Sequence, residues 1–442
     1  MNGFYDEKLF LQGESAQRIY NEIKDLPVVD YHCHLDQTKI KSDATFADIG
    51  EMWLAGDHYK WRAMRICGVD EKYITGDATF KEKFFKYAEI MPRLAGNALY
   101  YWTHLELKQI FGIDLPLNAD TASEIYERAN EKIKNISVRS LLKLYGVKYI
   151  ATTDDPVDTL DSHGVYDGIE VRPTFRPDKA LSLDEDYLNK LGENCGKKIE
   201  TTGDVIACLE ERLQFFVQNG CKISDHGFKD FPDVIIDKAT AEEYFARRES
   251  LGEVEKTRLL GYFLIELAKI YRKNGIVMQL HFSVTRNVNP AMKVRCGVDS
   301  GFDVIASAQK IENVIAFFSA ISDEQRPETI LYTLNDSDLP ALCCITGAFA
   351  HVKSGAAWWF NDTVEGIRKN LKTVAEYSVL GVNYGMLTDS RSFASYARFD
   401  FFRRLLAGYL GGLVDKGEYD ESAAIETAKN VSYYNIKDTL NI

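Results

Sequence analysis

The stretch Val28–Leu35 reads VVDYHCHL and combines a strand pattern with two histidines. Its β-branched start predicts a buried strand. Successive side chains of a strand point to opposite faces, so His32 and His34 project in the same direction. Two imidazoles that converge with a carboxylate can bind a divalent metal such as zinc. An isolated HxH pair, however, is more often one core histidine beside an exposed one.

Similar short apolar or β-branched runs recur along the rest of the chain, and helical patterns lie between them. We predict eight strands, at Val28–Leu35, Val147–Thr153, Glu170–Phe175, Cys221–Asp225, Val277–Phe282, Thr329–Leu334, Gly355–Phe360 and Tyr384–Thr388. Strands that alternate with helices indicate parallel βα units. Eight such units predict an α/β fold of the (β/α)8 TIM-barrel type, distorted by one long insertion.

The connection after the first predicted strand is far too long for a barrel loop. Residues 37–144 are rich in helical pattern and in aromatic side chains, and we expect them to form a helical insertion, a lid or subdomain over the site. The metal-dependent barrel domain would then consist of residues 1–36 and 145–442. From about Phe399 to Leu440 we expect a helical tail.

In such a barrel the chemistry lies where strands end and βα loops begin. His281 ends the fifth predicted strand, and Asp389 follows the eighth. Together with His32 and His34 they would place four metal-binding side chains at one rim, which favours a metal site over the structural interpretation. For His281 alone, the alternative is a histidine that hydrogen-bonds to one of the metal ligands without binding the metal itself.

Other polar residues fall at the same predicted rim. Arg176 follows the third strand, and Arg391 lies two residues beyond Asp389. A structural ion pair or a helix cap is the alternative role for Asp389 and Arg391. Asp225 and His226 end the fourth strand and could simply pair with each other.

Two segments combine aromatic and polar residues. In DHYKWR, which covers Asp57–Arg62, His58 and Tyr59 could supply acid–base groups from above the barrel. The same segment could equally begin an amphipathic helix capped by Asp57. Near the seventh predicted strand, Trp358–Phe360 is expected to be core or pocket wall, and one of its two tryptophans would suit a wall that stacks against a sugar.

The composition excludes several classes of protein. The 442 residues include 45% hydrophobic and 27% charged residues, as in ordinary globular proteins. A formal net charge of −13 argues against nucleic acid or an anionic membrane as the main partner. No GxGxxG follows a strand, and neither a P-loop nor a GxSxG motif is present, so dinucleotide enzymes, P-loop NTPases and α/β-hydrolases are not expected.

The cellular location is predicted from what the sequence lacks. No apolar run approaches the roughly 18 residues of a membrane span, and the N-terminus has no basic region before an apolar one. The eight cysteines contain no CxxC pair, and we expect them to be reduced thiols. We therefore expect a cytoplasmic protein.

Taken together, these segments resemble the uronate isomerase (glucuronate isomerase) family, a divergent branch of the amidohydrolase superfamily. The resemblance spans residues 30 to about 405, and its motifs occur in family order. They are Asp30–Leu35 (DYHCHL), Gly56–Arg65 (GDHYKWRAMR), Arg172–Ala180 (RPTFRPDKA), Met278–Asn287 (MQLHFSVTRN), Ala357–Asp362 (AWWFND) and Tyr384–Phe393 (YGMLTDSRSF).

The resemblance implies that D-glucuronate is interconverted with D-fructuronate, and D-galacturonate with D-tagaturonate. It implies one divalent metal, with zinc as the expected ion, bound by His32, His34 and Asp389. His281 would lie at or close to that metal. The residues expected around the substrate are Arg176, His58, Tyr59, Arg391, His281, Trp358 and Ser390.

An aldose–ketose shift of this kind moves a proton from C2 to C1 through an enediol, and it needs a base and stabilisation of an oxyanion. We expect Asp389 to be the base, with Arg391 and the metal as electrostatic stabilisers. Tyr59 and His58 would be acid–base partners, and Arg176 would clamp the substrate. A hydride shift is less suited to ligands that are mostly histidine.

Two other functions stay open at this stage. A metal-dependent hydrolase or deaminase of the same barrel type would use the metal to generate hydroxide, and a two-metal version could use a carboxylated Lys222 as bridging ligand. A non-catalytic uronate-binding protein would need the tryptophan wall and the arginines but no metal. The expected partner is a small hexuronate, and whether the chain forms a homo-oligomer is left open.

Overall fold

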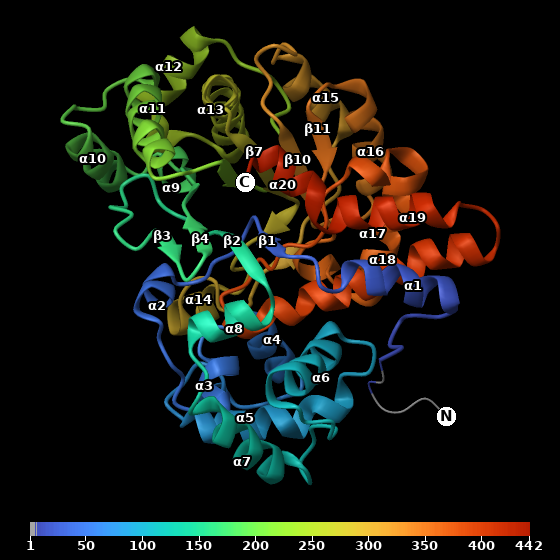
Figure 1. Ribbon diagram of the computed structural model, residues 1–442. Coiled ribbons are helices and arrows are strands. Elements are labelled where there is room, and N and C mark those ends of the chain that lie inside the picture. The colour runs from blue at the N-terminus through green and yellow to red at the C-terminus, as the bar shows by residue number, and fades with distance from the viewer. Residues whose placement is uncertain (1–4, 6) are drawn as a thin grey trace.

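The computed structural model describes Tyr5 and residues 7–442 as a mixed α/β fold (Figure 1). The strands are β1 (Val28–Asp30), β2 (Val147–Ala151), β3 (Gly164–Tyr166), β4 (Ile169–Arg172), β5 (Thr174–Phe175), β6 (Ile223–Gly227), β7 (Val277–Phe282), β8 (Val284–Thr285), β9 (Val304–Ile305), β10 (Thr329–Thr333) and β11 (Val352–Ser354). One sheet has the order β1-β2-β4-β3 and another β11-β10-β7-β6-β5, while β8 and β9 form a separate pair. The predicted α/β fold class is therefore confirmed.

Most neighbouring strands of the two larger sheets are parallel, and β3 alone runs antiparallel to its neighbour β4. β4 and β5 are consecutive in the chain and are separated by Pro173, which has no N–H to donate. At this break the sheets stay connected, because the Asp154 N–H donates to the Thr174 carbonyl (3.1 Å) and the Arg176 N–H to the Asp154 carbonyl (3.0 Å). Every residue of β7 and β10 is buried, as expected for parallel strands covered on both faces.

The first predicted strand, Val28–Leu35, is shorter in the structure, because β1 ends at Asp30 and His32 and His34 lie beyond it. The last two predicted strands also differ from the structure. The prediction of a strand at Gly355–Phe360 is wrong, because β11 ends at Ser354 and Trp359–Asn361 form a 3-10 turn. Trp359 adopts a left-handed φ of 50°, which no strand residue can have. Residues 384–388 form no regular strand, yet the segment that follows is bonded to the chain beyond β1: the Asp389 N–H donates to the His32 carbonyl (3.1 Å), and the His34 N–H to the Ser390 carbonyl (3.0 Å).

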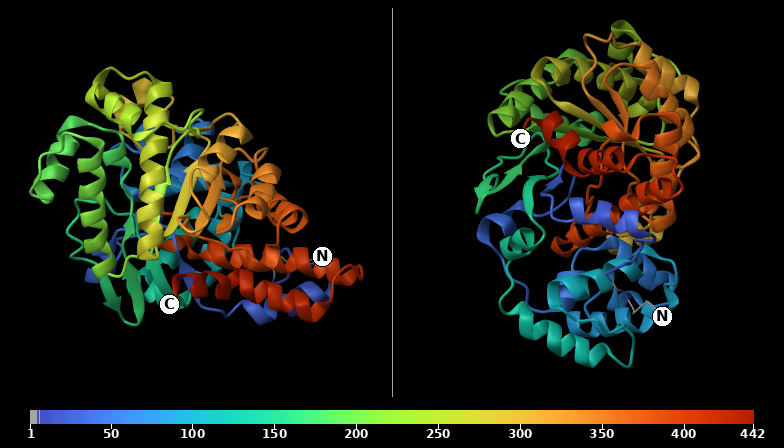
Figure 2. Two further views of the ribbon diagram at one scale, coloured as in Figure 1. Left: turned by 90° about the horizontal axis from the view of Figure 1, so that it is seen from above. Right: turned by 45° about the vertical axis from the view of Figure 1, so that its right-hand side comes forward.

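Helices surround the sheets. They are α1 (Glu14–Ile23), α2 (Gln37–Ser42), α3 (Ile49–Leu54), α4 (His58–Ile66), α5 (Phe80–Ile90), α6 (Ala98–Phe111), α7 (Ala122–Ile133), α8 (Val138–Leu144), α9 (Asp178–Leu181), α10 (Glu185–Asn194), α11 (Thr202–Gln218), α12 (Lys238–Ala246), α13 (Glu253–Asn274), α14 (Pro290–Cys296), α15 (Ile311–Ser319), α16 (Leu339–Ala348), α17 (Val364–Tyr377), α18 (Ala397–Asp415), α19 (Glu421–Lys429) and α20 (Asn435–Leu440). α2 to α8 all lie between β1 and β2, and Figures 1 and 2 show α3, α5, α6 and α7 gathered at one end of the molecule.

The helices between β1 and β2 share one hydrophobic core with the chain's two ends. The same buried cluster contains Trp53 and Phe84 of these helices, Ile19 of α1 and Leu406 of α18. α1 and α18 pack closely along each other, and α18 also contacts α6. The helical tail expected near the C-terminus is thus present, and its first helix is a central packing element.

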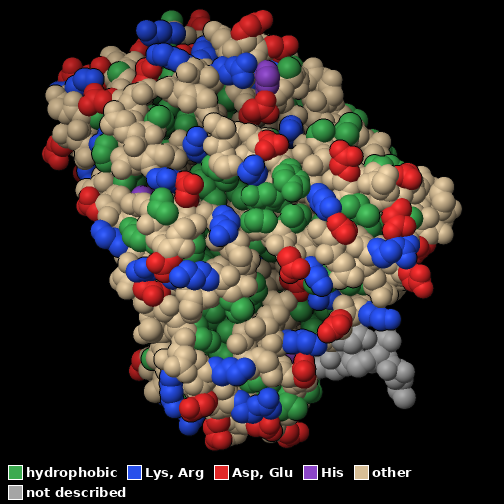
Figure 3. All heavy atoms as spheres, in the orientation of Figure 1, with side chains coloured by type: hydrophobic (Ala, Val, Ile, Leu, Met, Phe, Trp, Pro, Cys, Tyr) green, Lys and Arg blue, Asp and Glu red, His purple; other side chains and the backbone are tan. Residues whose placement is uncertain are grey.

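Surface and cysteine chemistry agree with the composition. Figure 3 shows Lys and Arg side chains interspersed with Asp and Glu over the face in view. Within the described part of the chain, no helix combines the length and the apolarity that crossing a membrane requires. All eight cysteines lie among the described residues and are free thiols.

The contact between α1 and α18 gives a test of the packing. Gly411 faces α1 so closely that a Cβ would lie 2.4 Å from the Ala16 nitrogen, whereas a Cβ on the adjacent Gly412 would meet nothing within 4 Å. We expect Gly411→Ala to lower the free energy of unfolding by about 1–3 kcal/mol through overpacking. Gly412→Ala, the matched control, should raise it by about 0.5–1 kcal/mol because alanine is the better helix former. Urea denaturation would measure both, and equal shifts would contradict the observed packing.

Candidate active site and metal centre

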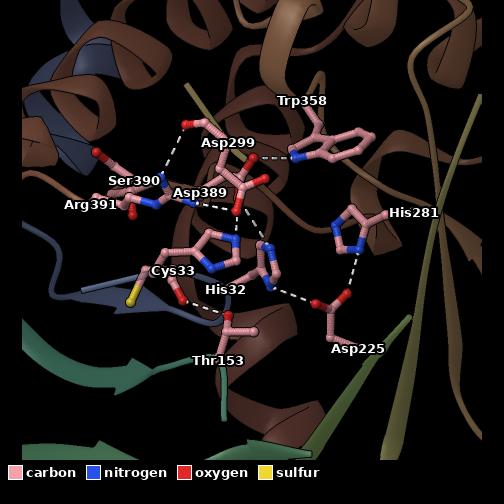
Figure 4. A network of polar contacts seen from close by, with 12 residues as sticks. His32, Cys33, Thr153, Asp225, His281, Asp299, Trp358, Asp389, Ser390 and Arg391 are labelled. Atoms are coloured by element: carbon pink, nitrogen blue, oxygen red, sulfur yellow. Dashed lines mark hydrogen bonds and ion pairs between the residues drawn. The ribbon is translucent and has the colours of Figure 1, made fainter. Parts of the chain in front are cut away.

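Three side chains from opposite ends of the chain converge on one point. His32 Nε2 lies 3.2 Å and His34 Nε2 3.1 Å from the same oxygen, Asp389 Oδ1. His32 and Asp389 are buried, and Figure 4 shows both pointing into a shared space. Although burial opposes it, hydrogen bonds from the two histidines hold the pKa of Asp389 well below its usual range. Burial lowers the pKa of His34, which favours the neutral imidazole that a metal requires.

A second cluster shares His32 with the first. His281 Nδ1 lies 2.6 Å from Asp225 Oδ1, and His32 Nδ1 lies 4.0 Å from Asp225 Oδ2. Arg176 Nη1 contacts the same Asp225 Oδ2 at 2.9 Å. Asp225 is fully buried, and although burial opposes it, Arg176 and the two histidines hold its pKa well below the usual range. Asp225 therefore keeps its negative charge beside the histidines at neutral pH.

The donor atoms fit a divalent metal. Both three-residue groups, His32–His34–Asp389 and His32–Asp225–His281, have ligand atoms within 4.8 Å of one another. His32 Nδ1 and His281 Nε2 are buried and have no hydrogen-bond partner among the described residues. Buried polar atoms are rarely left unpaired, so these nitrogens are available to a ligand. The structure therefore supports a metal bound by imidazole and carboxylate groups at this site.

A cavity of about 430 Å³ opens over both clusters. It is lined by four cationic side chains, seven carboxylates, four histidines, two tryptophans and a threonine. These are Arg176, Lys179, Arg286, Arg391, Asp154, Asp155, Asp158, Asp178, Asp299, Asp303, Asp389, His32, His34, His58, His281, Trp358, Trp359 and Thr153, of which His58 comes from α4. Guanidinium groups bind carboxylates through paired hydrogen bonds, and carboxylates accept bonds from hydroxyls. Such a lining suits a small polyhydroxy acid.

Trp358 and Arg391 border Asp389 on two sides. Trp358 Nε1 donates to Asp389 Oδ2 at 2.5 Å, which leaves Oδ1 facing the histidines. Arg391 Nη2 pairs with Asp299 Oδ2 at 3.0 Å across the mouth of the cavity. Both residues were predicted to contact substrate, and both line the cavity.

Ser390 does not line the cavity. Its hydroxyl pairs with the Ser395 hydroxyl at 2.6 Å and accepts from the Ser392 N–H at 3.0 Å. The hydroxyl is thereby used inside the protein, at the turn that leads into α18. The structure gives no support to the predicted contact between Ser390 and substrate.

His58 and Tyr59 lie on different sides of one wall. They begin α4, where the Asp57 carboxylate caps the helix by accepting from the Tyr59 N–H at 3.0 Å. His58 lines the main cavity, whereas Tyr59 lines an adjoining cavity of about 150 Å³, whose wall includes His58 itself. The Tyr59 hydroxyl donates to Asp362 Oδ2 at 2.9 Å. Burial lowers the pKa of His58 and raises that of Tyr59.

Two further candidates lie outside the cavity. His226 is buried and faces away from Asp225, with its ring 5.6 Å from the ring of Tyr271. Adjacent residues of a strand point to opposite faces, so the proposed pairing of Asp225 with His226 does not form. Lys222 precedes β6 and is not part of the cavity lining.

Sequence reasoning missed most of the acidic lining. Asp154, Asp155 and Asp158 follow β2, and their signal was the polar run TTDDP at the end of a predicted strand. Asp299 and Asp303 lie between α14 and β9, in a connection that carries no strand-end signal. Their contribution to the cavity comes from the fold of the loops.

Comparisons with known proteins identify the family of this chain. A family model described as glucuronate isomerase matches residues 1–440. The chain is 40% identical over 460 residues to uronate isomerase of Caldicellulosiruptor bescii, with 99% of each chain covered, and 40% identical to that of Shouchella clausii, with 98% and 97% covered. The crystal structure of uronate isomerase from Thermotoga maritima superposes with a TM-score of 0.95 at 34% identity, covering 99% and 100% of the two chains. Glucuronate isomerase from Caulobacter crescentus shares the fold, with a TM-score of 0.93, 23% identity and 99% and 97% covered.

The buried pair of Asp225 and Arg176 should matter for stability. We expect Asp225→Asn to lower the free energy of unfolding by about 1.5–3 kcal/mol, because Arg176 and His281 lose contacts to a buried charge while Asp178 still pairs with Arg176. Asp233→Asn is a matched control, since the Asp233–Arg258 pair has a similar distance, 2.8 Å, but the Asp233 carboxylate is 45% exposed where that of Asp225 is fully buried; it should change little. Chemical denaturation at pH 7 measures both. An Asp225→Asn protein as stable as the unchanged one would contradict the importance of this pair.

Proposed function

Since the chain belongs to the uronate isomerase (glucuronate isomerase) family, we propose that it interconverts D-glucuronate with D-fructuronate and D-galacturonate with D-tagaturonate. The observation that carries this proposal is the convergence of His32, His34 and Asp389 in a cavity bordered by arginines. A hexuronate offers one carboxylate to an arginine and several hydroxyls to the acidic lining.

Asp389 is the proposed base that takes the proton from C2 and returns it to C1. Its low pKa keeps it ionised at neutral pH, and its carboxylate lies inside the cavity rather than behind it. Arg391, two residues further on, stabilises the oxyanion that develops as the proton leaves. His58 exchanges the hydroxyl protons from within the cavity, and Tyr59 is its proposed acid–base partner across the wall that they share.

Arg176 and Trp358 bind the substrate in this proposal. Arg176 is held by Asp178 at 2.9 Å and by Asp225 at 2.9 Å, so its guanidinium is already oriented before substrate arrives. Trp358 offers an apolar surface beside His281, whose ring lies 4.6 Å away, and sugar rings stack on such surfaces. Ser390 has no assigned role, because its hydroxyl is bonded to Ser395.

His32, His34 and Asp389 would hold a divalent metal, with His281 next to it. The ligand set of imidazole and carboxylate favours zinc. When bound, the metal would supply positive charge that stabilises the oxyanion. We also propose that the cell compartment is the cytoplasm, which the eight free thiols support.

We extend the proposal to the architecture. Two observations support one distorted (β/α)8 barrel: the two larger, mostly parallel sheets are connected at Asp154, and the segment around Asp389 is bonded to the chain after β1. Residues 37–144 would be a helical insertion that covers the strand ends and supplies His58 to the site. The cavity does not support the two-metal hydrolase alternative, because Lys222, its candidate bridging ligand, is not among the lining residues.

The proposed activity is tested by NMR of the zinc-loaded protein with D-glucuronate in D₂O. We expect D-fructuronate with deuterium at C1, since an enediol lets the transferred proton exchange with solvent. Ketose without deuterium would keep the isomerase activity but would contradict an exchanging base. No ketose from either glucuronate or galacturonate would overturn the proposed function.

The proposed base is tested by Asp389→Asn. We expect turnover to fall by about 10²–10⁴-fold, the usual contribution of a general base. The metal content is measured alongside, so that loss of metal is distinguished from loss of the base. Asp336→Asn, which changes an exposed carboxylate paired with Lys369 at 2.6 Å, should leave turnover unchanged. Near-normal turnover of Asp389→Asn would show that the base is another group.

A further inference from the structure

A buried cluster of Arg398, Asp362 and Trp102 lies behind Tyr59 and Asp389, and the proposed reaction does not use it. All three side chains are buried. The guanidinium carbon of Arg398 lies 3.9 Å from the centre of the Trp102 ring and 4.8 Å from that of Tyr59. Its Nη1 lies 3.6 Å from Asp362 Oδ2, the oxygen that accepts from the Tyr59 hydroxyl.

Placing Arg398 here costs folding free energy. Its side chain is 1% exposed, and removing a charge from water is expensive even when a partner is close. It also lies in the first turn of α18, where the helix dipole disfavours a cation. Its Nε is buried without a hydrogen-bond partner among the described residues. Stability alone therefore gives little reason for an arginine at this position.

The geometry shows what Arg398 holds. Its Nη1 donates to the Thr388 carbonyl at 2.9 Å. That carbonyl belongs to the peptide unit that joins Thr388 to Asp389, and the N–H of the same unit donates to the His32 carbonyl at 3.1 Å. The unit is thus fixed at both ends, and Thr388 is further held by two hydrogen bonds to Asp30.

Asp389 needs this support. It adopts a left-handed φ of 43°, which costs a non-glycine residue about 1–3 kcal/mol and persists only where the surroundings fix it. Removing the bond from Arg398 to the preceding carbonyl would let the backbone relax and would turn the carboxylate away from His32 and His34. The position of a metal ligand thus depends on a side chain from α18.

Tyr59 depends on the same cluster. Its hydroxyl has a hydrogen bond to Asp362, and its ring lies between the rings of Trp102 and His58, with centroids 5.7 Å and 5.0 Å away. The flat guanidinium of Arg398 packs on that ring as well. Asp362 comes from the motif AWWFND, whose last residue had no expected role.

We propose that Arg398 and Asp362 are positioning residues of the isomerase site: Arg398 fixes the Thr388–Asp389 peptide and with it the metal-ligating carboxylate, and Asp362 fixes the hydroxyl of Tyr59. One buried cluster thereby sets the positions of two groups that belong to different segments of the chain. The inference rests on the proposed function for its kinetic consequence, but its consequence for metal binding does not.

The first test is Arg398→Lys. Lysine keeps the charge but has neither the planar face nor the fork of donors. Its single ammonium group can reach either the Thr388 carbonyl or Asp362, and without the stack on Trp102 it is not held at the carbonyl. We expect the affinity for zinc, measured by competition with a chelator, and kcat each to fall by about 10–100-fold, with a smaller change in KM. Arg403→Lys is the matched control, because Arg403 is also buried on α18 and donates to the carbonyls of Lys24 and Pro27 at 3.0 and 2.9 Å. It should lower stability and leave zinc affinity and kcat unchanged.

The second test is a double-mutant cycle between Asp362 and Tyr59. We expect Asp362→Ala to lower kcat by a smaller factor in Tyr59→Phe than in the unchanged background, since both variants remove the same hydrogen bond. The loss that remains in Tyr59→Phe reports Asp362 as the partner of Arg398. Asp362→Asn keeps a carbonyl acceptor for the Tyr59 hydroxyl and should retain most of the activity that Asp362→Ala loses. Additive losses would overturn the assignment of Asp362.

Each failure has its own signature. If Arg398→Lys binds zinc and turns over like the unchanged enzyme, or if it and Arg403→Lys lose activity alike in proportion to lost stability, the assignment of Arg398 is wrong. If the unchanged, zinc-loaded protein makes no ketose, the proposed function fails instead, and the zinc affinity of Arg398→Lys still decides whether Arg398 positions Asp389.

Discussion

Two backbone hydrogen bonds, between His32 and Asp389 and between His34 and Ser390, hold the chain's first strand region against a segment more than 350 residues later. The site depends on this contact because each segment alone carries only part of a metal-binding set. Joining segments so far apart costs chain entropy that grows only slowly with separation. The cost is offset where the contact is buried, and here Asp30 adds two side-chain bonds to Thr388 inside the same junction.

The two carboxylates closest to the histidines, Asp225 and Asp389, have hydrogen-bond and ion-pair partners before any ligand binds. Asp225 has Arg176 and His281 as partners, and Asp389 has His32, His34 and the Trp358 N–H. Electrostatic interactions in such a buried site are stronger than in water, so each carboxylate remains ionised and fixed in place. A divalent cation would find these donor atoms already oriented, and four cationic side chains line the same cavity.

The sequence predicted best those features that depend on strand periodicity. The strand-end position of His281 follows from the continuous apolar run of β7. His32 and His34 lie just beyond β1, which ends at Asp30, and they meet Asp389 through the backbone bonds of this segment rather than through strand alternation. Where turns decide the geometry, the sequence pattern was a poorer guide. Trp359 has a left-handed φ that ends the extended run, and Ser390 turns inward to Ser395. Neighbours on a helix point about 100° apart, so His58 lines both cavities whereas Tyr59 lines only the smaller one, and no spacing rule shows which of the two faces the candidate metal ligands.

The helices around the site are part of its construction. Those between β1 and β2 share a continuous buried core with α1 and α18, with large side chains such as Trp53 and Phe84 inside it. Moving these helices as a hinged flap would expose that core. Exposing each buried aromatic side chain would cost several kcal/mol of folding free energy. The wall that carries His58 is therefore fixed relative to α18, and α18 is in turn bonded through Arg398 to the peptide before Asp389. The same packing that stabilises the fold thus sets the distance between His58 and Tyr59 of α4 and the candidate metal ligands His32, His34 and Asp389.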